Sequence, residues 1–161
     1  MPASLAEFTL APLNFYDVSL IDGFNMLMVV KPIKRKGNCS TVGCDSNVKA
    51  TCPKELVVKA SGKTVGCCSA CDVFNTNEYC CRGNFGNPSI WKPMFYSKKF
   101  KEACPTSYSY AYDDPIGIFT CSGTDYVVAF CSSRFVIHWN LTKNYYMVRD
   151  DSLKHIYDIR L

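Results

Sequence analysis

The sequence lacks any long hydrophobic run and carries little charge of either sign. It contains no apolar stretch of roughly 18 residues, the minimum for a membrane-spanning helix. Charged residues make up 20% of the chain, and the formal net charge of +4 is too small an excess to indicate a nucleic-acid partner. Hydrophobic residues make up 48% of the 161 residues, which is typical of a globular protein of one domain or slightly more.

The first residues do not have the pattern expected of a secretory signal, although the cysteine content is that of a secreted protein. Residues 1–7 contain neither a basic segment nor an apolar segment before a cleavage site. Yet there are 11 cysteines, all between Cys39 and Cys131, a density that indicates a disulfide framework formed in an oxidising compartment. Because the count is odd, at least one thiol stays free even if every possible pair forms.

Residues 132–161 lack cysteine, glycine and proline, which separates them from the rest of the chain. Before them, alternating apolar and polar residues predict a mainly β fold. The expected strands are residues 5–10, 14–20, 25–30, 108–112, 116–121 and 126–131, with Pro32 ending the third. The clearest helix is 93–103, with a proline at its start.

Two aspartates stand where the second expected strand runs into a turn. Tyr16, Val18 and Leu20 alternate with Asp17, and the Asp22-Gly23 dipeptide is a turn signal. A turn at this point allows Asp22 to swing back towards Asp17. Two neighbouring acids form a negative site that suits a cation, a sugar or an acid–base reaction.

The cysteines between Cys67 and Cys81 allow three interpretations. They are disulfides around short helical turns, a zinc site using the spacing of Cys68 and Cys71, or a redox CxxC motif. No second CxxC at ribbon spacing, no nearby histidine and no βαβ pattern accompany the motif. Disulfides are therefore the favoured interpretation.

Several segments resemble, in the same order, plant thaumatin-like proteins, a pathogenesis-related defence family. They are residues 5–10, 15–25, 39–44, 52–56, 69–71, 78–81 and 103–114. The resemblance covers about residues 2–132. It implies a partial thaumatin-like β-sandwich with a disulfide-rich helix/loop domain inserted, and an acidic cleft between them. The expected parts are 1–45 and 105–132 for the sandwich remnant, 46–104 for the disulfide-rich domain, and 133–161 for a non-family tail.

The resemblance also implies a disulfide pairing. The bonds are Cys39–Cys121, Cys44–Cys104, Cys52–Cys67 and Cys71–Cys80. Three cysteines are left without an assigned partner: Cys68, Cys81 and Cys131. The family partner of Cys81 falls at Trp91, and that of Cys131 would precede Met1. We consider both a Cys68–Cys81 bond and free thiols.

By motif, the family's acidic cleft maps onto four residues of this chain. They are Glu7, Asp17, Asp22 and Asp113, with Asp114 beside the last. The cleft arginine of the family would precede Met1. Four acids without that arginine repel one another, so some of their pKa values should rise. The alternative is that each acid only hydrogen-bonds a turn.

The resemblance implies a defence protein that is antifungal and monomeric, and together with the cysteine content it implies an extracellular or apoplastic location. It would bind fungal cell-wall β-glucan through the acidic cleft. One alternative is a weak endo-β-1,3-glucanase that uses the cleft carboxylates, and another is a non-functional, truncated gene product. No cofactor, metal, nucleic acid or transmembrane segment is expected.

Overall fold

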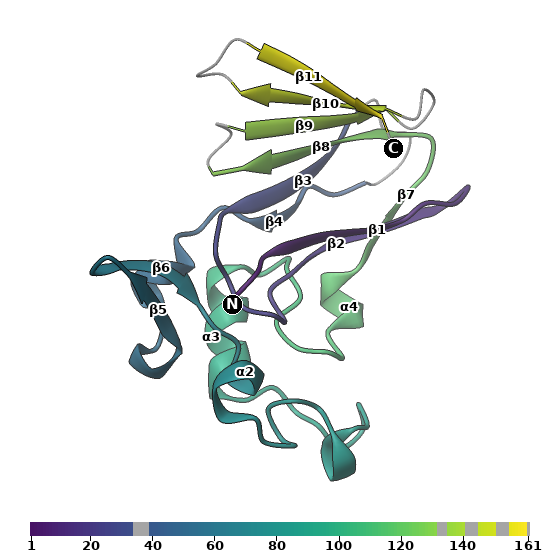
Figure 1. Cartoon of the computed structure of the whole chain (residues 1–161). Coiled ribbons are helices and arrows are strands. Elements are labelled where there is room, and N and C mark those ends of the chain that lie inside the picture. Colours follow the sequence, from purple (N-terminus) through teal and green to yellow (C-terminus); the bar gives the residue numbers. More distant parts are fainter. Residues whose placement is uncertain (34–38, 132–134, 141–144, 151–154, 161) are drawn as a thin grey trace.

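The computed structural model describes residues 1–33, 39–131, 135–140, 145–150 and 155–160 (Figure 1). Within these ranges the chain is mainly β, as predicted. One sheet has the order β1 (Leu5–Thr9), β2 (Asn14–Ser19) and β7 (Phe119–Cys121). A larger sheet has the order β11 (His155–Arg160), β10 (Tyr145–Asp150), β9 (Phe135–Asn140), β8 (Asp125–Phe130), β3 (Met28–Ile33) and β4 (Val42–Cys44).

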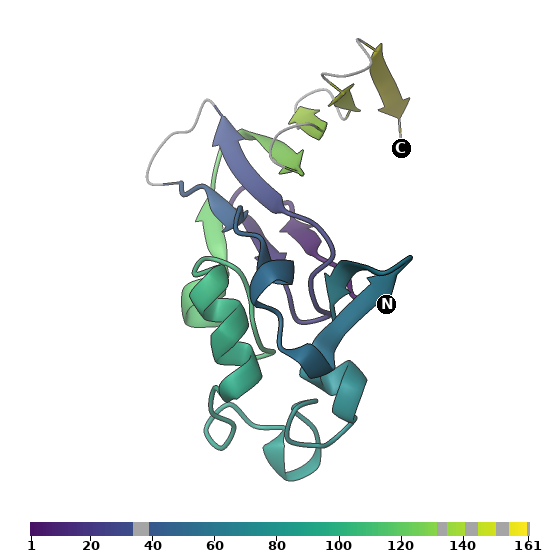
Figure 2. The same cartoon turned by 90° about the vertical axis from the view of Figure 1, so that its left-hand side faces the viewer.

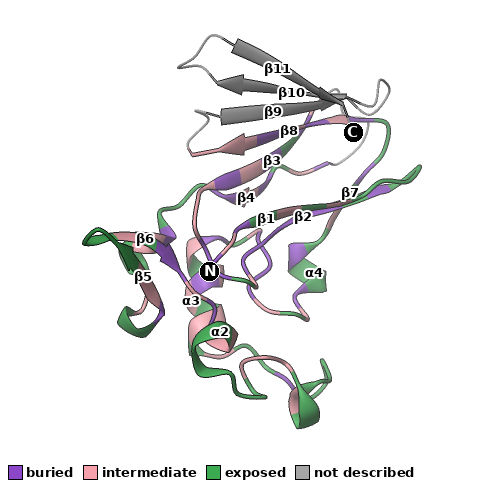
Figure 3. Cartoon of the chain, in the orientation of Figure 1, coloured by how far each residue is buried: buried purple, intermediate pink, exposed green. Residues whose placement is uncertain are grey.

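The two sheets share a core, which makes this part of the molecule a partial β-sandwich. Tyr16 and Val18 from β2 pack against Val30 of β3 and Tyr126 of β8, and all four are fully buried. The rings of Tyr16 and Tyr126 lie 5.0 Å apart. Figure 3 shows buried residues where the two sheets face each other and exposed residues along the outer rim. The alternation along β2 therefore places its apolar face in the core, as the sequence predicts.

The cysteine-rich segment forms short elements around a second core. These are α1 (Val48–Thr51), the 3-10 turns η1 (Lys54–Leu56) and η2 (Gly83–Phe85), the hairpin β5 (Val57–Ala60) and β6 (Lys63–Cys67), α2 (Ala70–Phe74) and α3 (Phe95–Ala103). Leu20 and Phe24, which follow β2, enter this core beside Leu56 and Phe100. Figure 2 shows α3 running along the side of this segment. The turn after β2 thus joins the two halves of the fold.

Four disulfides hold the arrangement together, and they are the four that the resemblance implies. Cys39–Cys121 links the segment before β4 to β7. Cys44–Cys104 joins β4 to the end of α3. Cys52–Cys67 closes a separation of 15 residues, worth about 3 kcal/mol by the chain-entropy argument. Cys71–Cys80 bridges α2 to the turn that follows it.

Three expectations about secondary structure are wrong. Pro32 does not end the third strand, because β3 continues to Ile33 and pairs Pro32 with Tyr126. On the other side of β3 the pairing with β4 stops at Val30, so the missing N–H of Pro32 costs no hydrogen bond there. Residues 108–112 do not form a strand either, since only Tyr108 makes a bridge. The expected strand 116–121 is shortened to β7 by α4 (Asp114–Gly117).

The last part of the chain extends the larger sheet. Strands β9, β10 and β11 follow β8 as successive antiparallel neighbours. Among the described helices, none is long and apolar enough to cross a membrane. The division of the chain into two structural domains and a tail stays a prediction.

Candidate functional site

Two of the four expected acids lie directly opposite each other on neighbouring strands. Glu7 of β1 pairs with Asp17 of β2 in the antiparallel register. Both line an open groove of about 310 Å³ on the outer face of this sheet. The remaining lining residues are Phe8, Thr9, Phe15, Ile21, Tyr108 and Ile118. The groove thus combines an acid pair with apolar and aromatic walls.

Asp17 is the acid with the most perturbed environment. Its side chain is 9% exposed, and its Oδ1 atom is buried without a hydrogen-bond partner. Burial raises the pKa of Asp17 from 3.8 to about 7, and the charge of Glu7, a hydrogen bond with Glu7 and the charge of Asp114 add to the effect. Asp17 therefore keeps a proton up to near-neutral pH and can donate it in a hydrogen bond.

Tyr108 borders the same groove and is held in place from three sides. Its backbone N–H donates to the carbonyl of Val18 at 2.9 Å, and its carbonyl accepts from Leu20 at 2.9 Å. Its hydroxyl donates to Oδ1 of Asp114 at 2.7 Å. Its ring lies on Gly117, where an added Cβ would come within 2.6 Å of the ring. Burial, followed by the hydrogen bond to Asp114, raises the pKa of Tyr108.

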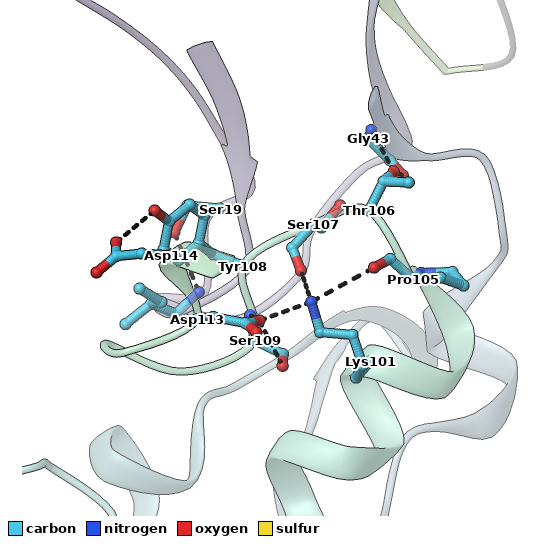
Figure 4. A network of polar contacts seen from close by, with 11 residues as sticks. Ser19, Gly43, Lys101, Pro105, Thr106, Ser107, Tyr108, Ser109, Asp113 and Asp114 are labelled. Carbon is cyan, nitrogen blue, oxygen red and sulfur yellow. Dashed lines mark hydrogen bonds and ion pairs between the residues drawn. The ribbon is translucent and has the colours of Figure 1, made fainter. Parts of the chain in front are cut away.

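Asp113 is buried in an ion pair instead of lining this groove. Its Oδ2 atom lies 2.6 Å from Nζ of Lys101, and it accepts hydrogen bonds from the backbone and hydroxyl of Ser109. Lys101 also donates to the carbonyl of Ser107 at 2.6 Å. Figure 4 shows the carboxylate of Asp113 turned towards Lys101 and that of Asp114 turned towards Tyr108. The sequence prediction put Asp113 ahead of Asp114, whereas Asp114 is the acid whose charge acts on Asp17.

Asp22 lies in the wall of a different cavity. It is exposed on the turn after β2, where Gly23 has a φ of +92°. This second cavity, of about 130 Å³, lies between the turn and the disulfide-rich segment. Its aromatic lining consists of Tyr79, Trp91, Tyr96, Phe100 and Tyr110. Ile21 borders both cavities. The structure thus brings Glu7 and Asp17 together and places Asp22 in the neighbouring cavity.

Three thiols are free: Cys68, Cys81 and Cys131. The hypothetical Cys68–Cys81 bond is therefore not formed in this structure. Trp91, which takes the position of the family partner of Cys81, is buried, and its ring stacks on Tyr110 at 4.6 Å. Its indole N–H donates to the carbonyl of Glu78 at 2.7 Å. A buried indole thus packs this segment at the position where the resemblance implies a disulfide partner for Cys81.

The zinc and redox interpretations of the CxxC motif do not hold, because Cys71 is bonded to Cys80. In the described part of the chain, no group of three or more histidine, cysteine or acidic side chains is arranged to hold a metal ion.

Comparisons with known proteins agree with the resemblance in the sequence. The Thaumatin family profile matches residues 1–132. A thaumatin-like protein of Arabidopsis thaliana is 56% identical over 133 residues, which are 81% of this chain and 55% of that protein. The pathogenesis-related thaumatin-like protein 3.5 of Cryptomeria japonica is 51% identical over 132 residues, or 82% of this chain and 55% of that protein.

A protein of Prunus avium named glucan endo-1,3-beta-glucosidase is 49% identical over 135 residues, which are 81% of this chain and 55% of that protein. The chain thus spans little more than half the length of these curated relatives. The match nevertheless covers most of the chain, and with the mainly β sandwich and the four disulfides it leads to one conclusion: the chain belongs to the thaumatin family.

Proposed function

We propose that the groove over β1 and β2 binds a neutral polysaccharide, fungal cell-wall β-glucan, in the service of extracellular plant defence. The observation that carries this proposal is the Glu7–Asp17 pair. A protonated Asp17 is a hydrogen-bond donor, and the exposed Glu7 beside it is an acceptor. Sugar hydroxyls both donate and accept, so a donor and an acceptor side by side match their chemistry.

The walls of the groove support the same ligand class. Phe15 and Ile118 are each 39% exposed and line the groove with Tyr108. Exposed aromatic and apolar side chains next to polar groups suit a sugar ring, which has apolar C–H faces and a polar rim. The names of the relatives add a defence context and, for the Prunus avium protein, a glucan substrate. The four disulfides fit an extracellular location.

Glucan hydrolysis is the second candidate, and the name of the Prunus avium relative favours it. The geometry of Glu7 and Asp17 favours binding instead. Retaining glycosidases hold their two carboxyl groups about 5–5.5 Å apart and inverting ones about 6.5–9.5 Å apart, with the scissile bond between them. Glu7 and Asp17 are direct cross-strand partners, so their carboxyl groups lie side by side on one face of the sheet and do not face each other across a scissile bond. We therefore place binding ahead of turnover.

A pull-down with insoluble β-1,3-glucan, followed by a reducing-sugar assay, tests both candidates. We expect wild-type protein to be retained on the glucan at mildly acidic pH without release of sugar. Glu7→Gln should weaken retention roughly tenfold, the cost of about 1.4 kcal/mol expected for a lost charged hydrogen bond. Asp72→Asn removes the same charge from the start of α2 and should bind normally. Equal retention of Glu7→Gln and wild-type protein would refute the proposal, and sugar release that needs Asp17 would establish the enzyme.

A further inference from the structure

Of the two cavities beside the turn after β2, the one lined by Asp22 is separate from the acid pair of the proposed glucan groove. We propose that this cavity binds a small organic cation with a methylated ammonium head group, for which choline is a simple test ligand. Neither Glu7 nor Asp17 lines this cavity, so the proposal stands or falls independently of glucan binding.

Aromatic rings from four separate segments line the cavity. Tyr79 follows α2, Trp91 precedes α3, Tyr96 lies in α3, and Tyr110 lies in the loop before α4. The rings of Trp91 and Tyr110 stack with their centroids 4.6 Å apart, and those of Tyr79 and Tyr96 pack edge to face at 5.4 Å. The negative faces of such rings attract a cation, and tryptophan does so most strongly. Several aromatic rings around one space are the arrangement by which proteins recognise quaternary ammonium groups.

The charged side chains of the cavity are all negative. Asp22 lines it from the turn after β2 and Asp72 from α2, and both are exposed. Among the described residues that line it, none is a lysine, arginine or histidine, although the chain has a net charge of +4. The ion pairs found between described residues include neither aspartate. Two carboxylates without a cationic partner give the cavity a negative potential, which favours a cationic ligand.

The remaining polar groups of the cavity do not suit a metal ion. Ca²⁺ and Mg²⁺ need about six oxygen ligands. The three serines of the lining, Ser69, Ser97 and Ser109, already form hydrogen bonds with other residues of the chain. The lining carboxylates are Asp22 and Asp72 alone among the described residues. A methylated ammonium donates no hydrogen bond and needs only π faces and negative charge, and the cavity offers both.

The cavity has the size and the rigid walls that such a head group requires. Its volume is about 130 Å³. Since a water molecule occupies roughly 10–15 Å³ of such space, the cavity can hold several heavy atoms, as in a trimethylammonium group. The indole N–H of Trp91 donates to the carbonyl of Glu78 at 2.7 Å, and the hydroxyl of Tyr96 donates to Oε1 of Glu55 at 2.6 Å. Walls that are already held in place need little ordering when a ligand binds.

The direct test compares choline with 3,3-dimethyl-1-butanol, a neutral molecule of the same shape in which carbon replaces the ammonium nitrogen. Proton–nitrogen NMR follows the indole N–H of Trp91 as each compound is added. Trp91→Phe identifies this signal, because Trp139 is the other tryptophan of the chain. Choline should bind saturably and about tenfold more tightly than the neutral compound, because the rings and the carboxylates act on its charge. Equal affinities would overturn the proposal, as would choline binding that does not saturate.

Single variants test the residues that supply the attraction. Tyr79→Leu should weaken choline binding about three- to tenfold, because it removes one ring from the wall. Asp22→Asn and Asp72→Asn should each weaken it about two- to threefold, the effect of one exposed charge near the ligand. Asp45→Asn is the matched control, since Asp45 is exposed and does not line the cavity. Unchanged affinity in Tyr79→Leu with a native NMR spectrum, or an equal loss in Asp45→Asn, would contradict this site.

Discussion

Replacing Asp17 by asparagine should stabilise the protein at neutral and alkaline pH, although it alters the centre of the proposed site. The folded protein holds the proton of Asp17 up to about pH 7, whereas the unfolded chain releases it near the ordinary value of 3.8. Between these values the folded state binds more protons than the unfolded state. The free energy of unfolding therefore falls as the pH rises through this window, and above it the ionised, buried carboxylate carries its full cost.

The size of the effect follows from the same two values. A rise from 3.8 to about 7 spans about three pH units, and each unit corresponds to 1.36 kcal/mol, which gives a ceiling of about 4 kcal/mol. Asp17 borders an open groove, so water reaches its surroundings and screens part of this cost. At each pH we compare the free energy of unfolding of Asp17→Asn with that of wild type. We expect this difference to be about 2–4 kcal/mol more favourable to the variant above pH 7 than near pH 4.

Urea unfolding followed by tryptophan fluorescence, repeated from about pH 4 to about pH 8, measures this difference. The quantity of interest is the stability of the variant minus that of wild type at each pH, because other titrating groups cancel in it. Asp22→Asn, which removes an exposed carboxylate from the turn after β2, controls for the general change of charge. A difference that stays flat with pH, or grows as the pH falls, would refute the buried-acid interpretation of Asp17.

Two further substitutions test buried contacts away from the groove. Lys101→Met should lower the free energy of unfolding in urea by about 3–5 kcal/mol, because it leaves the charge of Asp113 buried without a partner. Adding Asp113→Leu should restore much of this loss. A loss below about 1 kcal/mol would contradict the buried ion pair. Trp91→Ala should cost about 3–5 kcal/mol, and Trp91→Phe less, since the smaller ring can keep the stacking on Tyr110; equal losses would contradict that contact.

Local patterns predicted the strands that build the groove but not the segment that completes it. The alternation along β2 depends on one face meeting the core, and the structure has that face buried. Tyr108, Tyr110 and Tyr112 alternate in the same way, yet they do not share a strand. The ring of Tyr108 rests on Gly117, whereas Tyr110 stacks on Trp91. Alternation of apolar and polar residues indicates only that every second side chain is buried. In a loop, side chains that pack against unrelated partners can show the same alternation.

The pairing of the disulfides was available only through the family resemblance. Spacing alone left zinc, redox and disulfide interpretations open for Cys68 and Cys71, because all three chemistries use closely spaced thiols. The structure resolves the question through Cys80, which lies nine residues beyond Cys71 and bonds to it across a short helix and turn. The path of the chain between two cysteines decides whether their thiols meet. A local spacing motif contains no information about that path.

The choice between Asp113 and Asp114 shows why a motif can identify a site without identifying its residues. Adjacent side chains in a turn leave the backbone in different directions, so only one of the pair can face a given groove. Here the direction is decided by Lys101, twelve positions earlier on α3, which draws Asp113 into the interior. If Lys101 were neutral, the fully buried Asp113 would lose its cationic partner, and the acid facing Tyr108 would have to be established again. Lys101 therefore decides which of the two adjacent acids is turned inward. Glu7 and Asp114 are the charges that raise the pKa of Asp17, so neutralising Lys101 and Asp113 together should leave the titration midpoint of Asp17 unchanged.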